Sequence, residues 1–506
     1  MVIKVDGPMI QVLLYKTTGV NFSTGVQYRG AAGAIDGIDL GPFLGDEGSV
    51  RTTKGVDEPC GGFTVVFADR VANEGADTVY ALAEAMDMVE IRMKRIPPGV
   101  GALCPLVMRG FISKIRRDET IAADGRPQRV VIIEGQDMTK LWFNWSVLPE
   151  AQMAGDLVSM LSTYNLFAAA GIEYAIRPVA QFVRDFTETI MNAAVARFST
   201  VSGVAIPPFD ISRVTVPDDQ GLISAAILQG FPGGTYWDVV DYVADRPWNE
   251  LWVFDPPDGG NPQLIFRPVP YFDTGGGLIM PGAEDPGTIT WDIGEIVSLS
   301  SVRSDHRVAN FYWVPPGTSL PDSAGMTGIN SYVRLGGPPP SGPMWAIDHD
   351  NSNMAIYGLR KMQHDTRLIP SEIPEPRSAN LNTPGVRIEA GDITTLWNLL
   401  RCEQLRDLNW DNSVWETTEM VVKGHEDLIP GVYLEWTRGQ FRGSGLVSKA
   451  YIYRVAHTWV PLKSGTSAGW LTTLTLERGN GFLNRDGMGA SPYWAEGRRG
   501  PYSPTS

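Results

Sequence analysis

Ser467 is the residue of this sequence that comes nearest to a known catalytic motif. It stands at the centre of residues 465–469 (GTSAG), which match the Gly-x-Ser-x-Gly pattern of a nucleophilic serine. That chemistry needs a strand that turns sharply into a helix, so that the serine hydroxyl is exposed. Here the pentapeptide joins two predicted strands, where Gly and Ser are expected in a hairpin loop. We therefore predict a turn and no catalysis at Ser467.

Histidines with neighbouring carboxylates could hold a metal ion, and His349 is the candidate. It lies between Asp348 and Asp350, a triplet that offers one nitrogen and two oxygens. No second histidine is close in sequence, so a polar turn is the simpler interpretation. The other four histidines form no HxxxH or HExxH motif, and we predict no zinc site. They are His306, His364, His425 and His457.

Adjacent carboxylates could serve acid–base chemistry, but three such pairs lie in turn-like stretches and are interpreted as solvated turns. These pairs are Asp57-Glu58, Asp118-Glu119 and Glu426-Asp427. A glycosidase needs two carboxyl groups that face each other across a cleft, and no lysozyme-like or transglycosylase-like segment is recognisable. The glycine-rich stretches 275–277 and 443–445 lack the Lys-Ser/Thr of a phosphate-binding loop. We predict no catalytic, cofactor-binding or metal-binding residue, no cofactor and no enzymatic activity.

The composition describes an acidic globular protein. The 506 residues carry 42 Lys and Arg against 57 Asp and Glu, a net charge of -15, which repels nucleic acid and anionic membranes. We therefore predict no sequence-specific nucleic-acid binding. The cysteines Cys60, Cys104 and Cys402 suggest neither a disulfide framework nor a thiolate metal site. The apolar run 9–15 is too short to span a bilayer, so no stable membrane insertion is predicted.

The elements that would position these side chains are mostly β-strands. The 55 Gly and 37 Pro predict many turns, and residues 10–141 hold short runs of Val, Ile and Phe that indicate strands. The clearest hairpin joins residues 106–117 to 128–135. Four more strands are predicted at 420–424, 432–438, 450–461 and 470–478, the last of which alternates Leu and Thr. A long hairpin in each half hints at a duplicated barrel.

Helical periodicity interrupts these strands. Apolar residues recur at helical spacing in 157–164 and again in 178–198, which starts with a proline that a first turn tolerates. Residues 236–245 predict a short helix, followed by strands at 250–255 and 263–270. Strands at 296–302 and 308–314 and a helix at 392–408 are also predicted. Trp237, Trp248, Trp252 and Trp397 fall within or beside such elements and are expected in the core.

The predicted fold class is mainly β with inserted helices (α+β), divided into five segments. Residues 1–149 form a first β-barrel domain, 150–231 a helical insert and 232–290 a helix-plus-hairpin subdomain. Residues 291–485 form a second β-barrel domain with a long Gly-, Pro- and Ser-rich loop at 315–346, and 486–506 form a flexible C-terminal tail. The sequence thus predicts two antiparallel β-barrels with helical material between and within them.

Three stretches carry a resemblance to a known family. They are the strand 130–137 (VVIIEGQD) with the apolar segment at Leu141, the segment 265–270 (IFRPVP), and the closing sequence 428–478. The closing sequence contains residues 428–431 (LIPG) at a strand entry and a final strand pair, 453–457 (YRVAH) with 471–478 (LTTLTLER). The order of these pieces resembles the baseplate hub proteins of contractile-tailed phages, also called late-control or tail-hub proteins. The segment 150–230 matches no pattern that we identify.

The resemblance implies a homotrimer in which each chain supplies two tail-tube-like barrels, giving six barrels around a pore. Such a ring would join a threefold central spike to the sixfold tail tube and leave a channel for DNA. Besides other copies of the chain, the implied partners are the central spike, the tail tube or tube-initiator protein, the baseplate wedge proteins and the tape-measure protein. The implied location is the tail baseplate of the virion, after synthesis in the host cytoplasm.

Two other functions stay open from the sequence. One is a tail-associated hydrolase of peptidoglycan, and the other is a receptor- or glycan-binding tail protein at the tail periphery. If the chain does form a ring around DNA, some of its -15 charge is expected to face the channel. Acidic side chains there would repel phosphates and let the DNA slide.

Overall fold

The described part of the chain covers most predicted elements. The computed structural model describes residues 8–17, 37–44, 48–69, 78–96, 103–121, 127–147, 176–224, 233–272, 277–302, 304–314, 345–347, 357–368, 390–409, 415–438, 446–461 and 469–479. Outside these ranges lie the predicted helix 157–164, most of the loop 315–346, the tail 486–506, and both Ser467 and His349. No helix of the described ranges is long and apolar enough to cross a membrane.

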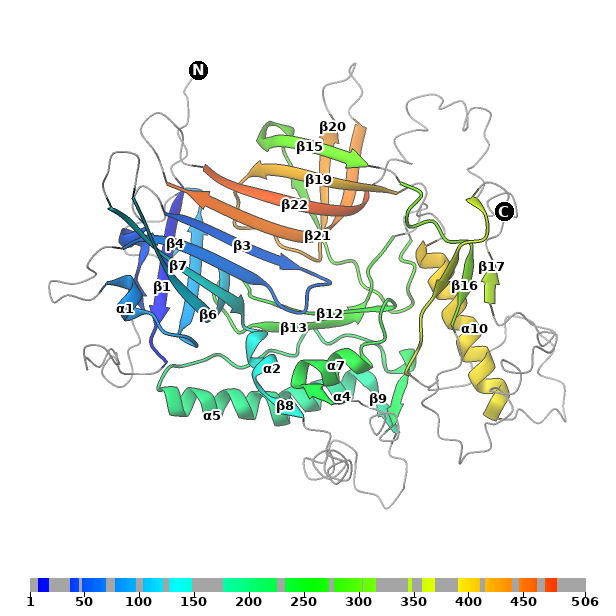
Figure 1. The fold of residues 1–506 in the computed structure, drawn as a ribbon. Coiled ribbons are helices and arrows are strands. Elements are labelled where there is room, and N and C mark those ends of the chain that lie inside the picture. The colour runs from blue at the N-terminus through cyan, green and yellow to red at the C-terminus, as the bar shows by residue number, and fades with distance from the viewer. Residues whose placement is uncertain are drawn as a thin grey trace.

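A 13-stranded sheet dominates the fold, and its order is β15-β19-β22-β21-β3-β4-β7-β6-β5-β1-β2, with β14 and β20 attached beside β21 (Figure 1). The N-terminal strands are β1 (Met9–Tyr15), β2 (Ile38–Asp39), β3 (Ser49–Gly55), β4 (Gly62–Ala68), β5 (Met88–Lys94), β6 (Leu106–Ile121) and β7 (Pro127–Asp137). The C-terminal strands are β14 (Thr288–Trp291), β15 (Ile296–Val302), β19 (Glu416–Lys423), β20 (Tyr433–Arg438), β21 (Leu446–Val460) and β22 (Gly469–Gly479). The two ends of the sequence therefore share one sheet.

Helices and short sheets lie below and beside this sheet in Figure 1. The helices are α1 (Val79–Leu82), α2 (Lys140–Asn144), α4 (Val179–Phe186), α5 (Asn192–Ser202), α7 (Tyr236–Val243) and α10 (Ala390–Asn409). The short strands are β8 (Ser146–Val147), β9 (Ile176–Pro178), β10 (Leu222–Ser224), β11 (Gly234–Thr235), β12 (Asn249–Phe254), β13 (Gln263–Pro268), β16 (Phe311–Trp313), β17 (Trp345–Ile347) and β18 (Lys361–Gln363). Of these, β12 and β13 form an antiparallel hairpin under the sheet.

Two parts of the sheet have the same topology. The N-terminal part has the order β3-β4-β7-β6-β5-β1, and the C-terminal part has the order β15-β19-β22-β21-β20-β14. Corresponding strands also follow one another along the chain in the same succession. We name these parts repeat 1 and repeat 2. One difference is that β1 runs antiparallel to β5, whereas β14 runs parallel to β20.

The long hairpin of each repeat carries the same irregularity. In β6–β7 the register shifts between Ile112 and Lys114. In β21–β22 it shifts between Ile452 and Arg454. A bulge of this kind kinks and twists a strand, so the two hairpins bend at the same place. Lys114 and Arg454 are therefore equivalent positions in the two repeats.

Each repeat curls around its own apolar cluster because its strands bury every second side chain. In β4 the alternation buries Phe63, Val65 and Phe67 within the cluster of repeat 1. In repeat 2 the cluster contains Met420, Val422, Leu434, Trp436, Leu474 and Leu476. Trp459 and Trp470 of repeat 2 join the cluster of repeat 1. Side chains of repeat 2 therefore pack within the core of repeat 1 at the junction of the two repeats.

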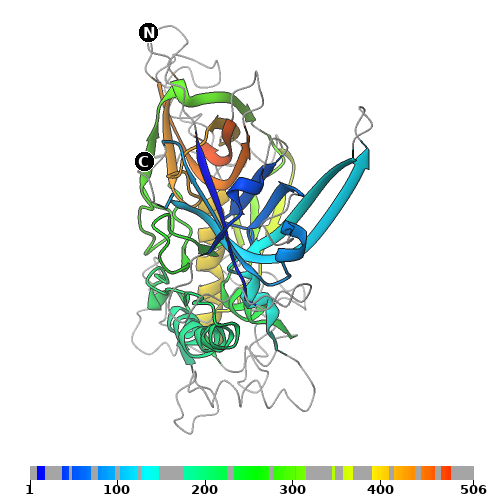
Figure 2. The ribbon, with the colours of Figure 1, turned by 90° about the vertical axis from the view of Figure 1, so that its left-hand side faces the viewer.

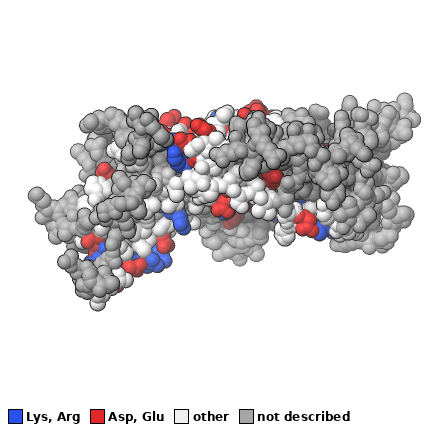
Figure 3. All heavy atoms as spheres, turned by 90° about the horizontal axis from the view of Figure 1, so that it is seen from above, with Lys and Arg blue, Asp and Glu red and all other residues white. Residues whose placement is uncertain are grey.

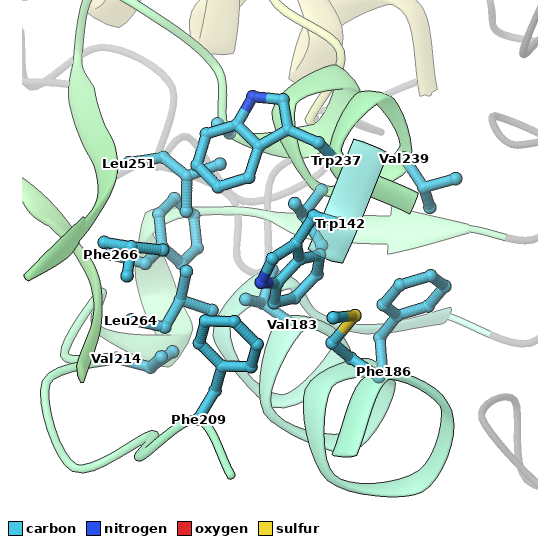
Figure 4. Packing of buried hydrophobic residues seen from close by; sticks show 14 of the residues in the cluster. Trp142, Val183, Phe186, Phe209, Val214, Trp237, Val239, Leu251, Leu264 and Phe266 are labelled. Atoms are coloured by element: carbon cyan, nitrogen blue, oxygen red, sulfur yellow. The ribbon is translucent and has the colours of Figure 1, made fainter. Parts of the chain in front are cut away.

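A third cluster packs the helices against the β12–β13 hairpin (Figure 4). Trp142 of α2 lies at its centre, with ring centroids 5.4 Å from Phe209, 6.0 Å from Trp237 and 6.4 Å from Phe186. Helix α7 begins at a capping box between Thr235 and Asp238, which satisfies backbone donors that the first turn leaves open. The helical layer is therefore a packed support under the sheet.

Most predicted elements are confirmed. The predicted helix 178–198 is present as α4 and α5, joined by a π-turn at Thr187–Met191, and the helices 236–245 and 392–408 are present as α7 and α10. The four tryptophans expected in the core are all buried, namely Trp237, Trp248, Trp252 and Trp397. The mainly β fold with helices is confirmed. Because one sheet runs through both repeats, two separate barrels and the five domain boundaries stay predictions.

Two predictions from the sequence are wrong in detail. The strand expected at 308–314 is shorter, since β16 covers only Phe311–Trp313. The turn expected from residue 118 is also shorter, because β6 continues to Ile121, so that Asp118 and Glu119 lie in a strand. Polar residues suggested a turn, but in an exposed two-stranded ribbon both faces can be polar, and Glu119 pairs across the strands with Arg129 at 3.4 Å.

Candidate assembly interface

The joint between the two repeats is an antiparallel pairing of β21 with β3. His457 faces Thr52 across it, and the imidazole is buried. The Thr472 hydroxyl lies 2.9 Å from Nδ1 of His457, and Nε1 of Trp470 donates to the same nitrogen over 3.3 Å. Desolvation lowers the pKa of His457 to about 3. The joint is therefore closed, desolvated and held by a neutral histidine at ordinary pH.

The β12–β13 hairpin is tied to repeat 1 by a buried ionic cluster. Arg109 donates to the carbonyl oxygens of Gly259 and Gly260 over 2.8 Å and 3.0 Å. The carboxylate of Glu90 holds that arginine and Arg92, each at 2.9 Å. Arg92 donates to the carbonyl oxygen of Cys104 instead. Because Arg109 reaches the backbone of the turn between β12 and β13, it fixes the position of the hairpin against β5 and β6.

The same hairpin is tied to repeat 2 by another buried network. Arg267 of β13 pairs with Glu250 of β12 at 2.5 Å and donates to the carbonyl oxygen of Gly431 over 2.7 Å. The hydroxyl of Tyr451 in β21 donates to the other oxygen of Glu250 over 2.7 Å. One hairpin therefore holds both repeats, which fixes the angle between them.

A partly buried lysine between two carboxylates completes the junction. Lys54 of β3 pairs with Asp137, which also accepts the backbone N–H groups of Gly61 and Thr139 at 2.9 Å and 3.0 Å. Burial raises the pKa of Asp255, just after β12, to about 6, although Lys54 acts in the opposite direction. The carboxylate of Asp137 thus accepts several hydrogen bonds. In contrast, one oxygen of Asp255 has no hydrogen-bond partner among the described residues.

Strand β15 is an edge of the sheet that has no second partner strand among the described residues. It pairs with β19 alone. Six of its seven residues are exposed, including Val297 at 57%, Leu299 at 40% and Val302 at 58%. Charged residues and proline keep an edge strand from pairing with another chain. The sequence of β15, IVSLSSV, contains neither. Such an edge is a template for a further strand.

The β6–β7 hairpin projects from the molecule as a ribbon (Figure 2). β6 pairs with β5 only over residues 106–111, but with β7 as far as Ile121. Beyond Ile112 its second edge therefore faces no strand among the described ranges. Ion pairs run along the ribbon, such as Lys114 with Glu134 at 3.7 Å and Arg117 with Asp69 at 2.6 Å. On the other side, β4 pairs with β7 as far as Val130, which faces Asp118, so in the described structure only the tip of the hairpin beyond Asp118 is two-stranded. The outer edge of β6 can therefore accept a further strand.

The histidines and acidic pairs do not assemble a reactive site in the described structure. No group of three or more His, Cys, Asp and Glu residues in the described ranges could hold a metal ion. His425 lies 3.5 Å from Asp427 and 3.9 Å from Glu426. In the first acidic pair, Glu58 forms an ion pair with Arg454 at 2.6 Å. Nδ1 of His425 accepts the backbone N–H of Asp427 over 3.2 Å, so the His425 contacts are local polar contacts, and the Glu58–Arg454 contact is an ordinary ion pair.

One hollow of about 420 Å³ brings several carboxylates together, as a hydrolase would require. Its lining includes Asp241, Asp245, Arg246, His364, Asp365 and Arg367. Asp245 forms a buried ion pair with Arg401 at 3.1 Å and accepts the Thr366 hydroxyl at 2.9 Å. Asp241 pairs with Arg246 at 3.1 Å. Two of the three carboxylates already hold cations, which favours a structural role for this hollow.

The interface was not predicted as such from the sequence. A long hairpin in each half was recognised, and the exposed β15 was expected only as a strand of the second barrel. The uncharged sequence IVSLSSV is the signal that could have singled it out, because an edge strand of a monomer usually carries a protecting charge. That β15 lies at an edge is known only from the strand order.

Comparison with known proteins gives matches among solved structures, and these include tail proteins. One is the tail protein from Neisseria meningitidis MC58, with 12% identity and a TM-score of 0.41 over 93% of this chain and 96% of that chain. Another is the 43 kDa tail protein of prophage MuSo2 from Shewanella oneidensis, with 9% identity and a TM-score of 0.45 over 93% and 98%.

A third match is a Francisella PdpA-VgrG complex, with 8% identity and a TM-score of 0.40 over 93% of this chain and 58% of that chain. No family model and no curated protein matches the sequence. Two of the structural matches are named as tail proteins, the broad class to which the sequence shows a resemblance. At these identities and TM-scores they do not by themselves assign a role to this chain.

Proposed function

We propose that this chain is a structural hub protein of a phage-type tail baseplate. Three copies form a ring that imitates sixfold symmetry, joins a threefold central spike to the sixfold tail tube and leaves a channel for DNA. The observation that supports this best is the repeated topology of the sheet, with the same strand order in repeat 1 and repeat 2. Because each chain contains two similar repeats, three chains supply six similar units to a ring.

The rigid junction supports the same function. A ring closes only if each unit stands at a fixed angle to the next. The β21–β3 pairing and the ionic ties of the β12–β13 hairpin to both repeats supply such a fixed angle within the chain. The open strand edges at β15 and β6 supply surfaces for other copies. The central spike, the tail tube or tube initiator, and the wedge and tape-measure proteins are the further partners of this proposal.

Native mass spectrometry combined with electron microscopy tests the proposal. The purified chain, alone or with its spike partner, is expected to form three-chain particles with six similar lobes around an opening. A chain that stays monomeric under all these conditions contradicts the proposal. A turbidity assay on peptidoglycan is expected to show no lysis, since two of the three carboxylates in the hollow beside Asp245 are paired with cations.

A further inference from the structure

We propose that β15 of one copy pairs antiparallel with the distal part of β6, residues 116–121, in the next copy. This seam rests on the proposed ring and names the strands that close it. Both strands have an open edge among the described residues, and both lie in exposed parts of the molecule. Joining them would continue the sheet from one copy into the next and satisfy backbone N–H and C=O groups on both sides.

The joint inside the chain is the template for this seam. Within one copy, β21 of repeat 2 pairs antiparallel with β3 of repeat 1. The matching strand orders make β21 the equivalent of β6, and β3 the equivalent of β15. The same joint between two copies therefore brings β6 of repeat 1 to β15 of repeat 2. In a ring of similar repeats, this seam alternates with the internal joint and closes by rotation.

The matching bulges also fix the register of the seam. Counting across each repeat from its bulge gives two equivalent rows of facing residues. The row in repeat 1 is Lys114, Glu134, Thr64 and Arg51, and the row in repeat 2 is Arg454, Thr475, Glu419 and Ser300. Arg51 and Ser300 are therefore equivalent positions on the strands that join a neighbour.

The internal joint then names the facing pair between copies. Thr458 faces Arg51 inside the chain. Lys114 and Arg454 are equivalent positions just after the bulges. Asp118 and Thr458 each lie four residues further along, so they are equivalent as well. Asp118 of one copy therefore faces Ser300 of the next. The neighbouring pairs follow from the same antiparallel register, with Glu119 opposite Leu299.

The side chains of the two strands are compatible at this register. β15 carries no charge, so it places none against the ribbon, whose charges already have partners such as Asp69 for Arg117. Serines on β15 leave room for the long side chains of the ribbon. The exposed apolar side chains of Leu299 and Val302 would be covered by the aliphatic stems of Glu119 and Arg116. The seam therefore buries the apolar part of an otherwise unprotected edge.

Disulfide trapping tests the register directly. The full chain with Asp118→Cys and Ser300→Cys is assembled, oxidised and run on a non-reducing gel. Covalent species of up to three chains are expected, since a facing pair in adjacent strands lies within reach of a disulfide. The control is Asp118→Cys with Ser298→Cys, which shifts one cysteine by two residues on the same face. It should cross-link at least tenfold less, and it carries the same native cysteines.

A charge on the edge tests the seam without cross-linking. Val302→Lys places a cation on the open edge and should raise the concentration at which the ring dissociates by at least tenfold. The melting temperature of the separated chain should not change, because Val302 is 58% exposed. The control is Thr417→Lys, which faces Val302 from β19 but does not lie at the edge. That variant should keep the ring.

The outcomes separate the seam from the ring itself. If the wild-type chain forms a ring while neither the Asp118–Ser300 pair cross-links nor Val302→Lys weakens assembly, the seam is wrong and the hub function stands. Cross-linking of Ser300→Cys to Ile10→Cys in β1, at the opposite end of the sheet, would likewise overturn it. If the wild-type chain never assembles, the proposed function itself is overturned.

Discussion

At the residue scale, the junction of the two repeats contains buried titratable groups whose effects on stability have opposite signs. Burial raises the pKa of Asp255 to about 6, above the usual aspartate value of about 3.9. Between roughly pH 4 and 6 the folded state therefore binds this proton more tightly than the unfolded state. Stability from this group is greatest below pH 4 and is lost as the pH rises through 6.

Removing the charge of Asp255 should stabilise the protein at neutral pH. We expect Asp255→Asn to raise the free energy of unfolding at pH 7.5 by about 1–3 kcal/mol, on the order of the cost of a shift of two pKa units, and to leave it unchanged near pH 4. Urea denaturation at several pH values measures this. The control is Asp258→Asn in the exposed turn of the same hairpin. A loss of stability at pH 7.5 would mean that the attraction to Lys54 outweighs desolvation.

His457 should have the opposite dependence on pH. Its pKa is lowered to about 3 in the fold and is about 6.5 in an unfolded chain. Its contribution is present above pH 6.5 and is lost as the pH falls toward 3, by up to about 1.4 kcal/mol per pH unit. His457→Asn should flatten that acid-side loss in denaturation curves between pH 6.5 and 4. His306→Asn, at an exposed position, should not flatten it.

At the element scale, helix α10 is anchored by one buried arginine. The guanidinium of Arg401 lies 3.1 Å from Asp245, donates to the carbonyl oxygen of Gln220 over 2.8 Å, and lies 4.4 Å from the ring of Trp397. Removing one partner of a buried ion pair leaves the other charge uncompensated. The arginine thereby joins α10 to segments far away in sequence, at residues 220 and 245.

Arg401→Met should destabilise the protein strongly. We expect a loss of about 3–5 kcal/mol in the free energy of unfolding, as for other broken buried pairs, measured by chemical denaturation. Arg406→Met in the same helix is the matched control. Its partner Asp407 is 48% exposed, so the loss there should stay below about 1 kcal/mol. Equal losses in both variants would show that the buried pair does not anchor the helix.

At the scale of the whole molecule, the net charge of -15 predicts weak contact with DNA. Viewed from above, acidic and basic side chains occur in small separate groups on the described surface (Figure 3). We call the face of the sheet that carries the rows starting at Lys114 and Arg454 the open face. It carries Arg51, Lys114 and Arg454 together with Glu134 and Glu419. Acidic residues do not dominate that face, so it gives no support to the expected acidic channel, which stays a prediction.

The assembled ring should nevertheless not retain double-stranded DNA at physiological salt. The overall negative potential opposes phosphate binding, and the cations of the open face are interleaved with carboxylates. An electrophoretic mobility assay with a duplex longer than the ring is expected to show no shifted band. A salt-sensitive shift at 0.15 M would mean that the cations of the open face act together as a binding surface.

The sequence by itself determined the local structure of this protein. Apolar periodicity gave the strands of the closing sheet and the helices at 178–198 and 392–408, because period and capping depend on neighbours along the chain. The same signals failed at Asp118 and Glu119, where an exposed ribbon permits polar residues on both faces of a strand. The sequence also shows that residues 296–302 (IVSLSSV) carry no charge. It does not show that this strand lies at an open edge of the sheet.

Only the tertiary structure decided how the two halves are joined. The pairing of β21 with β3 links residues about 400 positions apart, and no local preference encodes such a contact. It makes one sheet of two repeats, aligns their bulges and leaves β15 and the distal part of β6 at open edges. A strand is an edge strand only if one of its two sides has no partner strand. The strand order of the folded sheet decides this, and the sequence of the strand alone does not.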